Sequence, residues 1–414
     1  MATVRPFKAV RPSQERAAEV AALPYDVMSS EEAREMVKGN PYSFLHVDKA
    51  EIDLDPSTNI YDDAVYLKAK ETLEKFIAEG TLMTDSEPHF YIYKLTMDGR
   101  EQTGLVACAS IDEYLNGKIK KHELTLEAKE KDRIRHVETT NANTGPIFLA
   151  FKNKIEINEI LANWTKTVAP VYDFTADDGI GHAIWDVNES GTIDKIVSLF
   201  EGVDSLYIAD GHHRNASAVK VGLKKREAKG NFDGNEEFNF YLSVIFPDNH
   251  LKIFDYNRLV NSLNGLNENE FLAKVEESFD VEKIVGQECR PQKVQEFGMY
   301  LGGSWYKLTA KNVDDSLNPV DALDVSLLQN LLLTPILGIG DPRTDKNISF
   351  VGGIRGLGEL KNRVDSGEWA VAFAMFPTSM EQLFNVADNN QIMPPKSTWF
   401  EPKLRSGLFV HYLD

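Results

Sequence analysis

Cysteine is scarce in this sequence, since the 414 residues include only Cys108 and Cys289. Two cysteines form at most one disulfide, which argues against a secreted scaffold held together by disulfides. Long apolar runs are also missing: the stretch 326–340 is interrupted by polar residues and Pro335 before it reaches the roughly 18 residues that span a bilayer. The first 20 residues contain no apolar core of a signal peptide. We therefore expect a cytoplasmic protein without a membrane partner.

Positive charge is under-represented, because 45 Lys and Arg stand against 64 Asp and Glu and give a net charge of −19. A surface this acidic repels the phosphate backbone of nucleic acid over most of its area. Apolar residues make up 42% and charged residues 26% of the chain, which is the balance of a folded globular protein. We expect a small-molecule partner that enters a locally basic cleft, and no nucleic-acid partner.

The pattern of apolar and turn residues predicts a mixed α/β fold. Apolar segments at 90–95 and 104–109 flank a turn at 97–100 and predict a β-hairpin. At roughly 100–200 residues per domain, this length corresponds to two or three domains. We divide the chain into an N-terminal α/β region at 1–116, a core at 117–256, a small inserted α+β subdomain at 257–313 and a C-terminal α/β segment at 314–414 that completes the core. In the subdomain, the pattern predicts helices at 269–279 and 291–297.

The segment DSLYIADGHHRNASAV carries the clearest sign of a ligand site. A short apolar strand enters a turn at Gly211, where a glycine lets backbone approach a ligand, and the helix that follows attracts anions to its N-terminus. His212, His213 and Arg214 add donors on the same side, so we predict a phosphate-binding loop. In the alternative interpretation, Asp210 only caps the helix and the histidines pack in a polar core. Structural zinc is disfavoured, because neighbouring side chains diverge and no partner stands at zinc-like spacing.

The charged segment that follows residue 125 is predicted to form a helix that begins near Thr125. Spacings of four and three residues place Lys129, Arg133 and His136 on one face of this helix, where they would form a basic stripe. A ligand's phosphates could bind such a stripe. The alternative is that the stripe is only a solvated helix face.

His122 and Glu123 come just before the same helix. A carboxylate at the end of a strand can be fixed in place and act as a general base on a hydroxyl group. The local pattern also leaves Asp26, Asp132 and Asp210 open as alternatives for the base. The sequence therefore predicts a catalytic carboxylate, with Glu123 as the preferred residue.

A third candidate is the loop at 393–403, where prolines stiffen a segment that offers two lysines and two hydroxyl groups. It could clamp a second phosphate, or it could be a surface loop with chance lysines. The candidate residues are Lys396, Ser397, Thr398 and Lys403. The segment 341–345 could contribute carboxylates to a magnesium ion, although a simple turn is the preferred interpretation.

Several common catalytic motifs are absent. The sequence contains no G-x-x-x-x-G-K-[ST] loop, no Rossmann G-x-G-x-x-G placement and no G-x-S-x-G elbow. Cys108 lies in the middle of a predicted strand, where a small buried apolar residue is expected rather than a nucleophile. A P-loop ATPase and a standard dehydrogenase are therefore not supported.

Five segments resemble, in order, the landmarks of the bacterial and archaeal family known as domain of unknown function 1015. The resemblance spans nearly the whole chain. The segments are LPYDVMSSEEAREMVKGNPYSFLHV, KKHELTLEAKEKDRIRHVETTNANTGPIF, IADGHHRNASA, IGDPRTDKNISFVGG and MPPKSTWFEPKLRSGLF.

A more distant resemblance concerns the His-Glu step, a strand that begins Pro146-Ile147, and the Asp-Gly-His-His-Arg step at a helix start. Together they are similar to free-serine kinases of the ParB/sulfiredoxin-like fold, which phosphorylate L-serine with ADP or ATP. The resemblance implies a ParB/sulfiredoxin-like nucleotide-binding core at 117–256. Two features depart from a compact kinase: the long stretch at 154–204 between the steps, and the subdomain at 257–313.

Carried onto this sequence, the resemblance implies a magnesium-dependent small-molecule kinase. Glu123 would be the general base beside His122, and Asp210 would orient the loop or a magnesium-bound water. The nucleotide and phosphate groups would be bound by Gly211, His212, His213, Arg214, Arg133, His136, Asn143, Thr144, Lys396, Ser397, Thr398 and Lys403. The alternatives are a nucleotide-responsive binding protein without catalysis, and sulfiredoxin-like phosphotransfer to an oxidised cysteine. The latter ranks last, because His212 or His213 stands where that chemistry needs a cysteine.

Overall fold

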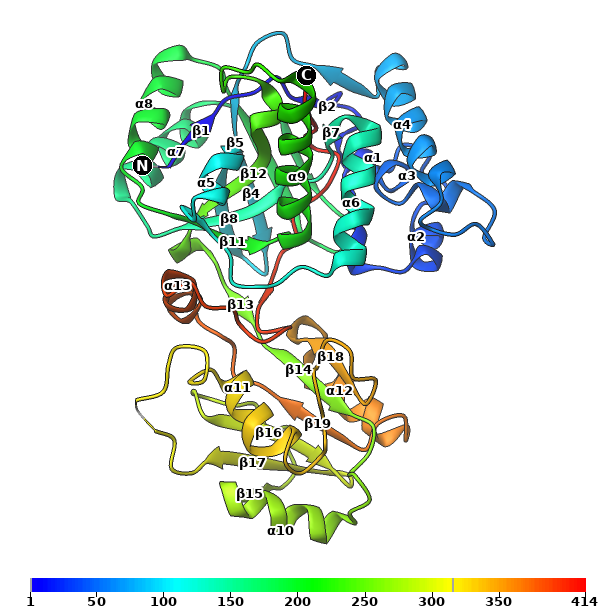
Figure 1. Cartoon of the computed structure of the whole chain (residues 1–414), viewed down its shortest axis with the longest axis vertical. Coiled ribbons are helices and arrows are strands. Elements are labelled where there is room, and N and C mark those ends of the chain that lie inside the picture. Colours follow the sequence, from blue (N-terminus) through cyan, green and yellow to red (C-terminus); the bar gives the residue numbers. More distant parts are fainter. Residues whose placement is uncertain (1, 315) are drawn as a thin grey trace. The chain divides into compact units, whose positions relative to one another are not determined.

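The computed structural model describes residues 2–314 and 316–414, which form two compact units (Figure 1). The first unit comprises residues 1–121, 125–251 and 402–414, and the second comprises residues 122–124 and 252–401. Both units combine β-sheet with helices, which confirms the predicted mixed α/β fold. In the described part of the chain, no helix is both long enough and apolar enough to cross a membrane.

A nine-stranded mixed sheet forms the centre of the first unit. Two of its strand pairs, β11–β6 and β12–β8, are parallel. The ninth strand, β1 (Val4–Arg5), pairs with β5 and is not part of the linear strand order given below. All five residues of β8 are buried, as expected of a strand covered on both faces. The main order is β6 (Ile119–Lys120), β11 (Leu206–Asp210), β8 (Ile147–Phe151), β12 (Phe240–Pro247), β5 (Arg100–Ser110), β4 (Phe90–Met97), β10 (Gly181–Val187) and β9 (Tyr172–Thr175).

The predicted hairpin is confirmed by β4 and β5, which pair antiparallel from Tyr91↔Val106 to Met97↔Arg100. The two turn residues between them, Asp98 and Gly99, have φ values of 51° and 76°. Positive φ at both central positions is the type I′ geometry that suits the right-handed twist of a hairpin.

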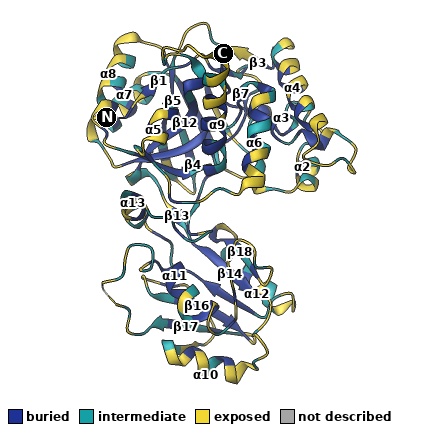
Figure 2. Cartoon of the chain, in the orientation of Figure 1, coloured by how far each residue is buried: buried dark blue, intermediate teal, exposed yellow. Residues whose placement is uncertain are grey.

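Helices cover the sheet of the first unit, and Figure 2 shows its strands buried while the outer faces of the helices are exposed. Apolar residues of α7, α8 and α9 join those of the strands in one core cluster. The helices of this unit are α1 (Ala17–Val20), α2 (Ser30–Met36), α3 (Leu45–Asp48), α4 (Asp63–Ala78), α5 (Ile111–Leu115), α6 (Glu127–Thr140), α7 (Ile155–Thr167), α8 (Ser190–Glu201) and α9 (His212–Lys229).

The last residues of the chain complete the first unit. Val410 bridges to Val10 of β2 (Val10–Pro12), a strand that also pairs with β3 (Leu82–Thr84). β21 (His411–Tyr412) pairs with β7 (Ala142–Asn143). Val410 also belongs to the apolar cluster of the N-terminal helices. The first unit is therefore built from segments at both ends of the sequence.

The second unit contains a six-stranded antiparallel sheet and a separate strand pair, β13 (Ile253–Phe254) with β20 (Trp399–Phe400). The sheet order is β15 (Phe279–Ile284), β17 (Ser304–Ala310), β16 (Glu296–Leu301), β19 (Val371–Ala374), β14 (Tyr256–Val260) and β18 (Ile348–Gly352). The helices are α10 (Glu268–Ser278), α11 (Asp324–Leu328), which continues into a π-helical turn at Gln329–Leu333, α12 (Gly356–Asp365) and α13 (Met380–Asp388).

This unit is larger than the subdomain expected at 257–313, because β18 and β19 lie beyond residue 313 and pair with β14 and β16. The helix predicted at 269–279 is confirmed as α10. The helix predicted at 291–297 is wrong, because β16 begins at Glu296 and pairs with β17 on one side and β19 on the other.

Asp324, the first residue of α11, makes the stability of the protein depend on pH. Its side chain is buried, Oδ1 accepts a hydrogen bond from the backbone N of Gln295 at 2.8 Å, and Oδ2 has no partner among the described residues. Burial raises the pKa of Asp324 to about 7, although the Gln295 hydrogen bond acts in the opposite direction. As the pH rises from about 4 to about 7, the unfolded chain loses this proton while the folded protein keeps it.

Folding stability therefore falls over that window, and Asp324→Asn should remove the fall. We expect the variant to match the wild type near pH 4 and to exceed it at pH 8, by at most about 4 kcal/mol for a shift of this size. Thermal unfolding followed by circular dichroism at both pH values measures the difference. Asp280→Asn is the control, because that side chain is 78% exposed. Equal effects of the two substitutions at pH 8 would contradict the prediction.

Candidate functional site

The turn between β11 and α9 has the strand–turn–helix geometry that the sequence predicts. Residues 206–209 of β11 are buried, Gly211 is the N-cap residue of α9 with φ +91°, and the helix begins at His212. A Cβ at Gly211 would lie 3.2 Å from the guanidinium of Arg214. Position 211 therefore needs glycine both for its backbone conformation and for the close approach of Arg214.

Asp210 fixes this turn through two hydrogen bonds. Oδ1 accepts from the backbone N of Gly211 at 2.8 Å, and Oδ2 accepts from Nζ of Lys403 at 3.0 Å. Burial alone would raise the pKa of Asp210, but the nearby charges of Lys403 and Arg214 and these hydrogen bonds hold it well below its usual range. The carboxylate is ionised and both of its oxygens accept hydrogen bonds, so it is suited to orient the loop rather than to exchange a proton.

Arg214 lies between two glycines. Its Nη1 donates to the carbonyl of Pro146 at 2.5 Å, and a Cβ at Gly145 would lie 3.6 Å from the same nitrogen. The Nε of Arg214 is buried and has no hydrogen-bond partner among residues 2–314 and 316–414. The guanidinium is thus held in place while one of its donors remains available to a ligand.

An open pocket with a cavity volume of about 30 Å³ lies beside Arg214, entirely within the first unit. It brings together five residues predicted from the sequence: Arg133, His136, Asn143, Thr144 and Arg214. It is completed by Tyr25, Asp48, Val137, Gly145 and Ile147.

Arg133 supplies a second guanidinium to this pocket. It is buried, stacks on the ring of Tyr25 at 4.0 Å, and donates from Nε to Asp132 at 2.8 Å. Burial lowers its pKa, but Tyr25 and Asp132 outweigh that effect and raise the pKa above its ordinary value. Two permanent positive charges therefore line the pocket of an otherwise acidic protein.

His136 does not contribute the positive charge that the basic stripe predicts. Burial and the charge of Arg133 lower its pKa, so the imidazole is neutral at pH 7. Its Nε2 lies 3.1 Å from the carbonyl of Val47, which only accepts, so this nitrogen carries the proton. Arg133 and His136 are buried while Lys129 is exposed, so the alternative of a solvated helix face is wrong for Arg133 and His136, and Lys129 does not share their buried surroundings. The helix face that carries both residues packs inside the first unit.

Tyr25 and Asp48 also line the pocket, and their polar side chains were not among the residues predicted from the sequence. Oδ1 of Asp48 accepts a hydrogen bond from Oγ1 of Thr144 at 2.7 Å, and the Asp48 side chain is 4% exposed. Because Asp48 and Thr144 are 96 positions apart, no local spacing predicts their contact. For Tyr25, the signal in the sequence is an aromatic residue directly after Pro24 in the first landmark segment.

Asn143 and His213 are held by the fold around the pocket. Oδ1 of Asn143 accepts from the backbone N of Leu242 at 3.3 Å. Nε2 of His213 accepts from the backbone N of Leu126 at 3.0 Å and so ties the start of α9 to the residue before α6. The geometry gives Asn143 and His213 positioning roles.

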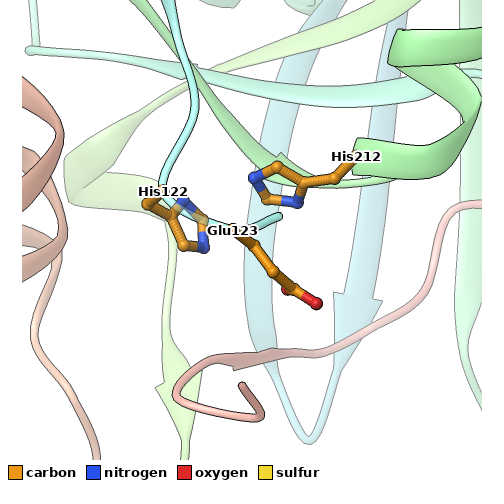
Figure 3. A group of neighbouring side chains, drawn as sticks. All are labelled: His122, Glu123 and His212. Carbon is orange, nitrogen blue, oxygen red and sulfur yellow. The ribbon is translucent and has the colours of Figure 1, made fainter. Parts of the chain in front are cut away.

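The remaining predicted residues do not line this pocket. Figure 3 draws His122 and Glu123, which come from the loop after β6, and His212, which begins α9. His122 is buried, Glu123 is half-buried, and both group with the second unit. Lys396, Ser397 and Thr398 also belong to the second unit, where Nε2 of His122 lies 3.3 Å from Oγ1 of Thr398. The segment 341–345 forms an exposed turn in which Asp341 pairs with Arg343.

Comparison with solved structures finds only weak likenesses. A conserved hypothetical protein from Pyrococcus furiosus is 15% identical, with a TM-score of 0.35, over 74% of this chain and 95% of that one. A free serine kinase in complex with AMP is 14% identical, with a TM-score of 0.36, over 73% and 92%. A C-terminally truncated SbnI from Staphylococcus aureus is 11% identical, with a TM-score of 0.37, over 74% and 87%.

No curated protein matches the chain significantly. The sequence model of one family, described as "Protein of unknown function (DUF1015)", matches residues 4–326. That range includes the loop between β11 and α9 and every residue that lines the pocket. The chain therefore belongs to the DUF1015 family, as its landmark segments predict.

Proposed function

We propose that this protein is a small-molecule kinase that transfers a phosphoryl group from ATP or ADP to a hydroxyl group, with free L-serine as the preferred acceptor. The observation that carries the proposal is the pocket in which the guanidinium groups of Arg133 and Arg214 meet beside the N-terminus of α9. Phosphoryl transfer requires mainly positioning and positive charge around the transferring group. These residues supply that charge in a protein whose net charge is −19.

The proposed base is Glu123. Asp132 forms an ion pair with Arg133, and Asp210 forms one with Lys403. Asp26 is exposed. Glu123 is half-buried and lies directly after His122 in the loop that follows β6.

Short segments of chain join Glu123 to two residues that contact β11 and α9. Lys120 pairs with Tyr207 of β11, and the backbone N of Leu126 binds Nε2 of His213. Glu123 is three residues from each of these anchors, a span of at most roughly 10–11 Å. These two anchors support a role for Glu123 at the same loop.

In the proposed reaction, the hydroxyl oxygen of the acceptor attacks the terminal phosphorus of the nucleotide. The bond from that phosphorus to the bridging oxygen breaks, the shortened nucleotide leaves with the electron pair, and Glu123 takes the hydroxyl proton. Arg133 and Arg214 bind the phosphate oxygens, while Asp210 and Lys403 hold the loop in place.

The pocket is compatible with Mg²⁺. It offers one carboxylate, that of Asp48, which suits an ion whose remaining ligands are nucleotide phosphates and water. When bound, the ion would neutralise charge on the phosphates.

Phosphorus NMR of the purified protein tests the proposal directly. The protein is incubated with magnesium, L-serine and either ATP or ADP, and the spectrum is followed for the resonance of O-phosphoserine. We expect that resonance to grow at the expense of one nucleotide. If both nucleotides bind tightly and neither yields a phosphomonoester, the kinase proposal fails and the alternative of a non-catalytic nucleotide-responsive protein takes its place.

A further inference from the structure

Arg258 is a buried charge in the sheet of the second unit, on the strand next to the edge strand β18. It lies on β14 and is 4% exposed. Across the two neighbouring strands it stands opposite Phe350 and Phe373. Its guanidinium lies 5.5 Å from the centre of the Phe350 ring. A permanent cation therefore occupies a position where sheets normally place an apolar side chain.

In the described part of the chain, the guanidinium of Arg258 donates its hydrogen bonds to backbone carbonyl groups. Nη1 donates to the carbonyl of Tyr256, and Nη2 donates to the carbonyl of Lys396 at 3.1 Å. Among residues 2–314 and 316–414, no carboxylate pairs with it. The nearby carboxylate of Asp255 is engaged with Asn257 at 2.7 Å and with Arg290 at 3.5 Å.

Burial without a counter-ion lowers the pKa of Arg258 to about 10, and only a weak opposing contribution from Tyr256 raises it. The side chain is still charged at neutral pH. A buried charge without an opposite charge is costly, and proteins usually pair it or use it to bind a ligand.

The loop that Arg258 contacts has a fixed backbone and carries a second cation. Lys396 has φ +59°, a conformation uncommon outside glycine. Two further hydrogen bonds hold the next residue: Oγ of Ser397 donates to the carbonyl of Pro394 at 2.6 Å, and Oγ1 of Thr378 donates to the carbonyl of Ser397 at 2.9 Å. The Lys396 ammonium lies 5.5 Å from the ring centre of Tyr256.

We propose that Arg258 and the loop 396–398 form a binding site for a small oxyanion, which is a phosphate or carboxylate group of a ligand. The guanidinium has further N–H donors beyond the two that bind carbonyls, and such donors recognise planar or tetrahedral oxyanions. All of these residues belong to the second unit, and the inference does not depend on the proposed kinase activity. It gives Lys396, Ser397 and Thr398 a role apart from the pocket of the first unit.

The test uses a local probe, because the first unit also contains a phosphate-binding candidate. The ring of Trp399 lies 4.9 Å from the ring of Tyr256, and the chain contains five tryptophans. Full-length protein labelled with 5-fluorotryptophan is followed by fluorine NMR, and Trp399→Phe assigns the resonance. Inorganic phosphate and acetate are titrated in separate arms, with chloride at equal ionic strength as the reference. We expect a saturable shift of the Trp399 resonance in at least one arm, and the arm that responds identifies the oxyanion.

Arg258→Met should weaken this response on the order of ten- to hundred-fold, the loss expected for charge-assisted hydrogen bonds. Arg214→Met in the first unit and the exposed Arg343→Met should leave it unchanged. In chloride, Arg258→Met should melt no lower than the wild type, because an unpaired buried charge is replaced by an apolar side chain. If Arg258→Met does not fold, Arg258→Lys takes its place in the test. Lysine keeps the positive charge but lacks the planar guanidinium, so this variant should also weaken the response.

The proposal is overturned if neither anion shifts the Trp399 resonance, or if the shift is unchanged in the Arg258 variant that folds. A melting temperature of Arg258→Met far below that of the wild type, with no effect of either anion on the wild type, would instead assign Arg258 a purely structural role. Loss of kinase activity or of nucleotide binding has no bearing on either outcome.

Discussion

Glu123→Gln is expected to lower the rate of phosphoryl transfer by about 10²–10⁴-fold, the usual contribution of a general base. Glutamine has nearly the same size as glutamate but accepts no proton from the acceptor hydroxyl. Nucleotide affinity should change little, because the cations that we assign to the phosphates are Arg133 and Arg214. Initial rates from phosphorus NMR and nucleotide affinity from calorimetry separate the two effects.

The matched control is Glu127→Gln, four residues later in the sequence. Glu127 is exposed and pairs with Lys131 at the start of α6, so the same change of charge and shape occurs away from the loop. The control should retain full activity. Undiminished transfer in Glu123→Gln would remove Glu123 from the base role, and Asp26 would then be the next carboxylate to substitute.

Arg214→Met is expected to weaken nucleotide binding on the order of ten- to hundred-fold, since each hydrogen bond between charged groups contributes roughly 1.5–3 kcal/mol. We expect the hundred-fold loss if the nucleotide accepts a hydrogen bond from the buried Nε of Arg214 as well as from its outer nitrogens. Methionine preserves much of the side-chain volume between Gly145 and Gly211, so the loop should keep its shape. Isothermal titration with ATP and with ADP measures the loss.

Lys224→Met is the control for this experiment. Lys224 lies on the same helix, is 57% exposed and pairs with Glu138, so its replacement removes one positive charge at a distance from the pocket. We expect affinity within about two-fold of the wild type, since an exposed ion pair contributes little. Equal losses in the two variants would indicate a general effect of net charge and would contradict a specific role for Arg214.

Local signals predicted the parts of the fold and of the site that depend on neighbouring residues. The order of an apolar strand, Gly211 and a helix requires only backbone conformations that the sequence encodes within a few positions. The same holds for Asp98 and Gly99, whose left-handed conformations make the hairpin turn. Such features could be predicted because their causes lie within a short stretch of chain.

Features that depend on distant segments could not be predicted in this way. The spacing of Arg133 and His136 correctly placed them on one helix face, but the sequence could not reveal that Tyr25 and Asp48 would cover that face. The extent of the second unit was underestimated for the same reason, because the pairing of β14 with β19 joins residues more than 100 positions apart. Periodicity indicates which residues share a face, while the partner of that face depends on the tertiary fold.

The return of residues 402–414 to the first unit has a consequence for synthesis. On the ribosome, the second unit is synthesised before Lys403, so Asp210 lacks its ion pair with Lys403 during the translation of 192 intervening residues (211–402). The second unit has all but three of its residues in one continuous segment, and it can fold during that interval. A chain released before Lys403 would carry the second unit and a β11–α9 turn in which Asp210 lacks its ion pair with Lys403. The ion pair between Asp210 and Lys403 therefore forms only after residue 403 has been made.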